Sequence, residues 1–139
     1  GYRFRQGFYM DKVKLYKTII PLNVVSDTTL TLCIGEDSYK QYCKKIKVSP
    51  REDVDTYNGC FLWFPNSDIK HTVIYLRLKE ENRSLLSYKS TLVHEINHAV
   101  THIFNTYDFN CDELRSYLMQ DIYFDFIDYI DTLNDKGLL

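Results

Sequence analysis

The sequence predicts one α+β domain over residues 1–139, with a small mixed or antiparallel sheet packed against a motif-bearing helix and a long C-terminal helix. Short segments rich in Val, Leu, Ile and Thr lie in the first half of the chain, and helical periodicity covers residues 84–131. No Pro/Gly/Ser-rich linker divides the two halves. Hydrophobic residues make up 45% of the chain, which suits one compact core at this length.

Two strands and a short helix are predicted in the first half. Residues 13–22 are rich in Val, Leu and Ile, and residues 28–34 alternate polar and apolar side chains, so both segments are expected to be strands. Gly35 ends the second strand, and residues 36–46 are typical of a short helix. Pro50 closes this region.

Two further strands precede the helical block. Asn58-Gly59 indicates a turn, residues 60–64 are apolar, and Pro65 stops that strand. Residues 71–78 alternate well and are expected to form the next strand. The block 84–131 contains one expected break, at residues 105–110, which gives the order β-β-α-β-β-α-α.

Composition excludes several classes of protein. The net charge is −2, and no apolar run approaches the roughly 20 residues that a membrane span needs. The basic run Lys40, Lys44, Lys45 and Lys47 is interpreted as a solvated helix face, so nucleic acid is not an expected partner. With no secretory signal recognised, the expected location is cytoplasmic, with four free thiols. Residues 1–9 precede the first methionine and are interpreted as an expression leftover or a disordered leader.

The segment His94-Glu95-Ile96-Asn97-His98 is an H-E-x-x-H motif. With 4 His in 139 residues, chance would produce only about 0.005 such matches. Residues four apart lie on one face of a helix, so both imidazoles can converge on one ion. The intervening Glu points about 100° away from the first His, where it can reach a water bound to the metal. The motif therefore indicates metal-assisted hydrolysis.

The apolar residues around the motif predict how its helix packs. Leu92, Ile96, Ala99 and Ile103 form a stripe at helical spacing that is expected to pack on the sheet, with the histidines facing away from it. A second layer must then cover the histidine side, and the last helix is expected to supply it. The expected covering face consists of Glu113, Tyr117, Gln120, Phe124 and Ile127.

A hydrolytic zinc site needs a third protein ligand and one open position. His102 lies about 12 Å along the helix axis from His94, too far to share one ion. The remaining candidates are Asp108, Cys111, Asp112 and Glu113. Glu113 is preferred, because it begins the expected covering face and has a long side chain. Residues 110–113 also fit a helix N-cap with a capping-box glutamate, which leaves a structural role for Glu113 open.

The H-E-x-x-H-A segment at residues 94–99, followed by Glu113-Leu-Arg-Ser-Tyr117-Leu118, resembles the small gluzincin-type metallopeptidases of phages and prophages. The resemblance covers roughly residues 55–131. It implies a minimal zincin-like fold, with His94, His98 and Glu113 as Zn2+ ligands and Glu95 as general base. It also implies a peptide or protein substrate, extended along an edge strand at residues 59–64 or the strand after it. Tyr117 would be a helper near the metal.

Two other functions fit the same residues. The chain could be a non-catalytic zinc-binding protein of phage or prophage origin that binds a host or phage partner, with Cys111 as a fourth ligand. It could also be a regulatory peptidase that cleaves a single repressor-like protein. An exchangeable water on the metal distinguishes an enzyme from a structural site, because structural zinc is usually closed by four protein ligands.

Overall fold

The computed structural model describes residues 14–21, 25–65, 68–78 and 83–139, so the segment 1–9 lies outside the described residues. The elements are β1 (Tyr16–Ile19), β2 (Thr28–Ile34), α2 (Glu36–Lys45), the 3-10 helix η2 (Val54–Thr56), β3 (Gly59–Phe64), β4 (Lys70–Leu76), α3 (Leu85–Tyr107) and α4 (Asp112–Asp135). The predicted order of strands and helices is confirmed, and so is the α+β class. β2 has the bounds expected from its alternation.

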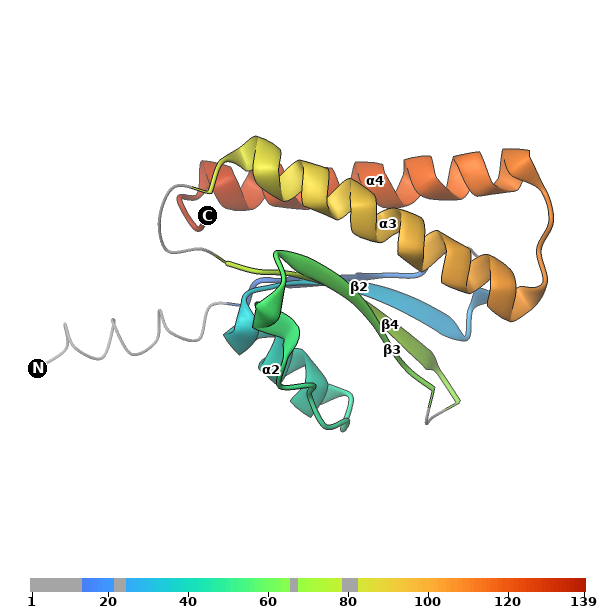
Figure 1. The fold of residues 1–139 in the computed structure, drawn as a ribbon, viewed down its shortest axis with the longest axis horizontal. Coiled ribbons are helices and arrows are strands. Elements are labelled where there is room, and N and C mark those ends of the chain that lie inside the picture. Colours follow the sequence, from blue (N-terminus) through green and yellow to red (C-terminus); the bar gives the residue numbers. More distant parts are fainter. Residues whose placement is uncertain (1–13, 22–24, 66–67, 79–82) are drawn as a thin grey trace, which may run out of the picture.

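The described elements form three layers (Figure 1). The middle layer is a four-stranded mixed sheet with the order β1-β2-β4-β3. β1 and β3 lie at the two edges, each antiparallel to its neighbour, while the central strands β2 and β4 run parallel. Helices α3 and α4 cover one face, and α2 covers the other.

Two separate apolar cores follow from the alternation along β2. Leu30, Leu32 and Ile34 belong to the core beneath α3 and α4, whereas Cys33 belongs to the core beneath α2. Both faces of this strand are therefore covered, although its sequence alternates polar and apolar residues. The turn from β2 to α2 depends on Gly35, whose φ of 87° is a conformation that glycine adopts at little cost.

Helices α3 and α4 form an antiparallel hairpin. The start of α3 meets the end of α4, where Lys89 Nζ lies 2.8 Å from Asp131 Oδ1. The predicted contact face of α4 is wrong, because Tyr117 and Phe124 are 60% and 73% exposed. The stripe that actually packs consists of Leu118, Ile122, Phe126, Ile130 and Leu133. It lies elsewhere on the helix because the sequence offers apolar residues on both faces.

Arg83 fixes the N-terminal half of α3 over the strands β3 and β4. Its guanidinium donates to the carbonyl oxygen of Arg77 just beyond β4 and, at 2.9 Å, to Oγ1 of Thr91 in α3. Thr91 also limits the space over the first residue of β3. A Cβ on Gly59 would lie 2.6 Å from Cγ2 of Thr91, so β3 and α3 can approach this closely only because residue 59 is glycine.

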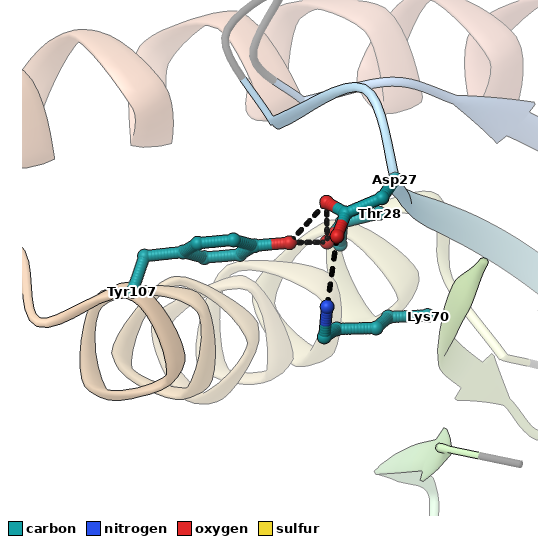
Figure 2. Close-up of polar contacts among 4 residues, drawn as sticks. All are labelled: Asp27, Thr28, Lys70 and Tyr107. Carbon is teal, nitrogen blue, oxygen red and sulfur yellow. Dashed lines mark hydrogen bonds and ion pairs between the residues drawn. The ribbon is translucent and has the colours of Figure 1, made fainter. Parts of the chain in front are cut away.

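A polar cluster fixes the other end of α3 (Figure 2). The phenol of Tyr107, the last residue of α3, donates to the carboxylate of Asp27 and lies within hydrogen-bond distance of the Thr28 hydroxyl. Lys70 at the start of β4 donates to the other Asp27 oxygen at 2.8 Å. The starts of β2 and β4 and the end of α3 are thereby joined, and the middle of α3 is held between two anchors.

All four cysteines, Cys33, Cys43, Cys60 and Cys111, are free thiols, as expected. Among the described residues, no helix combines the length and the apolar character that crossing a membrane requires.

Candidate functional site

The H-E-x-x-H motif lies on the middle turns of α3, as its spacing predicts. Ile96 and Ala99 are buried against the sheet, together with Leu92 one turn earlier. His94 and His98 are exposed, and the side chain of His94 retains 70% of its accessible surface. Burial of the apolar stripe thus fixes the rotation of the helix about its axis, and the two imidazoles project from an exposed side of the helix.

The two histidines converge on one point. Their Nε2 atoms lie 3.2 Å apart, and the rings meet edge to face. If an ion lay about 2.05 Å from each Nε2 atom, the angle between the two nitrogen–ion bonds would be about 100°, close to the angle of about 109° in a tetrahedral site. The spacing of the two donors therefore fits zinc.

Glu95 lies beside this pair but is turned toward the protein interior. It is 6% exposed, and its Oε2 atom is 4.0 Å from Nε2 of His94. Burial raises the pKa of the Glu95 carboxyl, and the neighbouring His94 and His98 oppose that shift. Cys60 on β3 shares this region, and burial raises the pKa of its thiol to about 11. The site thus combines two solvent-accessible imidazoles with a buried carboxylate beside them.

The wall opposite the histidines is the edge strand β3. A cavity of about 570 Å³ lies between α3 and β3, lined by Gly59, Cys60, Phe61, Trp63, His94, Glu95, His98, Thr101, His102 and Asn105. The expectation that the last helix covers the histidine side is wrong, since no residue of α4 lines this cavity. Helix α4 packs along another side of α3. The histidines share their cavity with β3, so the expectation that they face away from the sheet is also wrong.

Sequence reasoning missed the aromatic part of this cavity. The ring of His102 lies 4.8 Å from that of Trp63 and 5.3 Å from that of Phe61, centroid to centroid. Residues 60–64 are uniformly apolar, so alternation could not tell which side chains face α3. The available signal was the helical spacing of His98 and His102, which places His102 one turn beyond the motif.

The candidate third ligands do not join the histidine pair. Among the described parts of the chain, no three His, Cys, Asp or Glu side chains come together in a way that could hold a metal ion. Glu113 is exposed, as are Asp108, Cys111 and Asp112. The capping-box interpretation of residues 110–113 is wrong, because the N-cap of α4 is Cys111 and no side chain caps the helix.

Arg115 explains the direction of Glu113. Its Nη2 atom donates to Asn97 Oδ1 at 2.7 Å and to Thr101 Oγ1 at 3.0 Å, so Arg115 faces α3. Two residues apart on a helix correspond to side chains about 160° apart, which turns Glu113 away from α3. Asn97 is itself part of the motif. The first turn of α4 is thus attached to the histidine helix through its arginine and not through its glutamate.

Comparison with known protein families, curated proteins and solved structures gives no match for this chain.

Proposed function

We propose that this protein is a zinc-dependent peptidase in which His94 and His98 bind the metal and Glu95 is the general base. The observation that carries the proposal is the 3.2 Å separation of the two Nε2 atoms beside the Glu95 carboxylate. The resemblance of residues 94–99 and 113–118 to gluzincin-type peptidases gives the same roles. The open cavity beside the pair offers room for a substrate.

Each residue of the motif has a distinct role in this proposal. When bound, a zinc ion supplies a Lewis acid and a water whose pKa is about 7. The Glu95 carboxylate accepts a proton as water attacks the peptide carbonyl, and then passes that proton to the leaving amine. Its burial favours this exchange, because a desolvated carboxylate holds a proton more readily than an exposed one.

The substrate is proposed to lie along β3. This strand pairs with β4 on one side and has no second strand partner among the described residues. Backbone groups on the free edge can pair with an extended peptide, which orients the peptide without reading its sequence. Such a peptide would cross the cavity beside His94 and His98, because β3 forms the cavity wall.

Glu113 stays the proposed third ligand on the basis of the sequence alone; in the structure its side chain is turned away from α3, so binding through Glu113 requires the first turn of α4 to move. The exposed position of its side chain makes a direct test necessary. The zinc content of Glu113→Gln is compared with that of Asp112→Asn, Cys111→Ser and Asp108→Asn. Loss of zinc in Glu113→Gln alone supports the assignment, whereas full zinc content in that variant removes Glu113 from the ligand set.

The peptidase proposal is tested with Glu95→Gln. The zinc-loaded protein and the variant are incubated with denatured casein and a mixture of unstructured peptides, and products are identified by mass spectrometry. We expect cleavage by the native protein and at least a hundredfold slower cleavage by Glu95→Gln at equal zinc content. Equal activity of the two proteins would exclude Glu95 as the base.

A further inference from the structure

We propose that Phe61, Trp63 and His102, here called the aromatic shelf, select a large apolar side chain of the peptide, preferably aromatic, two or three residues from the cleaved bond. This inference rests on the proposed peptidase function and adds a substrate preference to it.

The shelf is built by two elements and remains accessible. Phe61 and Trp63 lie two positions apart on β3 and share the face toward α3, and their rings stack at 5.9 Å with an interplanar angle of 28°. His102 of α3 packs against both rings. Trp63 is nevertheless 53% exposed, which is unusual for the largest apolar side chain of the chain. An exposed stacked surface of this kind favours an aromatic partner.

The shelf and the histidine pair are parts of one cavity. Six helix positions separate the midpoint of the pair from His102, which is about 9 Å at a rise of about 1.5 Å per residue. An extended peptide covers that length in about three residues, at about 3.3 Å each. A peptide cut beside the histidines therefore places a side chain two or three residues from the cleaved bond over the shelf.

The chemistry of the cavity favours a peptide with an apolar side chain. None of its described lining residues is Lys or Arg, so apart from the proposed zinc ion the cavity lacks the cationic side chains that neutralise a phosphate backbone or an acidic side chain. Burial lowers the pKa of His102, which keeps its ring neutral at neutral pH. Aromatic rings in a cavity without Lys or Arg, beside a free strand edge, fit an extended peptide better than a nucleic acid strand.

The test uses two readouts on one set of probes. Blocked octapeptides of Ala and Ser carry Phe, Leu, Asp or Lys at each position in turn. The zinc-loaded native protein supplies cleavage sites and kcat/KM. The emission of Trp63, the one tryptophan of the chain, reports binding to the Glu95→Gln variant without any need for hydrolysis. Single-stranded oligothymidine is the competing probe.

We expect Phe two or three residues from the cut to raise kcat/KM about tenfold over Asp, and Phe peptides to shift Trp63 emission to shorter wavelength. Trp63→Ala abolishes the preference and Trp63→Phe retains most of it. Phe124→Ala, which removes an even more exposed aromatic side chain outside the cavity, leaves the preference unchanged.

The outcomes separate the shelf from the peptidase activity. If the native protein cleaves peptides without a preference for Phe, or if Trp63→Ala keeps that preference, the substrate-selecting role of the aromatic shelf is wrong and the peptidase proposal is unaffected. Absence of cleavage together with a Phe-dependent emission shift supports the shelf as a peptide site and counts against hydrolysis. Absence of any peptide effect, or an emission shift with oligothymidine alone, overturns the shelf as a peptide-binding surface.

Discussion

The phenol of Tyr107 donates a hydrogen bond to the carboxylate of Asp27, which joins the last residue of α3 to the start of the central strand β2 (Figure 2). Arg83 makes the corresponding attachment near the first turn of α3. Between these two points the helix carries His94, Glu95 and His98 past the edge strand β3. The distance between the histidines and β3 therefore depends on contacts at both ends of α3.

Tyr107→Phe removes the hydroxyl of this network and keeps the ring. We expect the melting temperature to fall by about 3–5 °C, because one hydrogen bond is lost and the Thr28 hydroxyl loses a partner. Thermal unfolding followed by circular dichroism measures the change. An unchanged melting temperature would mean that the network does not anchor α3.

The same network predicts a pH dependence of stability. The hydrogen bonds from Lys70 and Tyr107 lower the pKa of Asp27 in the folded protein. A carboxyl with a lowered folded pKa contributes stability above its unfolded pKa of about 3.9, and that contribution is lost as the pH falls through the folded pKa. In urea titrations between pH 7 and pH 2.5, Asp27→Asn should therefore lose less stability on acidification than the native protein. Parallel curves for the two proteins would contradict this role of Asp27.

Two phenylalanines of α4 distinguish the observed packing face from the predicted one. Phe126 is fully buried, whereas Phe124 is 73% exposed. Phe126→Ala should lower the free energy of unfolding by about 3–5 kcal/mol, and Phe124→Ala should change it by less than about 0.5 kcal/mol. Chemical denaturation of the two variants measures both values. A larger loss of unfolding free energy in Phe124→Ala than in Phe126→Ala would support the packing face predicted from the sequence.

Gly59→Ala should disturb the contact between β3 and α3. The added Cβ would lie 2.6 Å from Thr91 Cγ2 and 3.1 Å from the carbonyl oxygen of Tyr75, so the strand or the helix must shift. We expect a loss of about 1–3 kcal/mol of unfolding free energy. The double variant Gly59→Ala/Thr91→Ser removes the Cγ2 atom and should recover part of the loss. Equal stability of the single and double variants would show that Thr91 is not the obstacle.

Local features of the fold could be predicted from the sequence because they depend on neighbouring residues. Alternation gave the bounds of β2, and helical spacing placed the motif on α3 with its apolar stripe against the sheet. The break between the long helices, at residues 108–111, overlaps the predicted break at residues 105–110, since α3 ends at Tyr107 and α4 begins at Asp112. Each of these features is set by periodicity or by a turn.

The arrangement around the histidines could not be predicted, because it depends on contacts between distant segments. Helix α4 carries apolar residues on two faces, and only packing selects Leu118 and Phe126 over Tyr117 and Phe124. The parallel pairing of β2 with β4 leaves β3 at the edge, where its aromatic side chains face the motif. A single sequence carries no signal for the packing face of α4 or for the position of β3 in the sheet. Sequence patterns therefore placed the last helix beside the histidines, where the structure has β3.

Zinc stoichiometry tests the central claim most directly. The protein is loaded with Zn2+, dialysed against metal-free buffer and measured by mass spectrometry of the metal, alongside His94→Ala, His98→Ala and His102→Ala. We expect about one zinc per chain in the native protein and in His102→Ala, and less than about a tenth of that in the other two variants. Equal zinc content in all four proteins, or none in any of them, would contradict a metal site formed by His94 and His98.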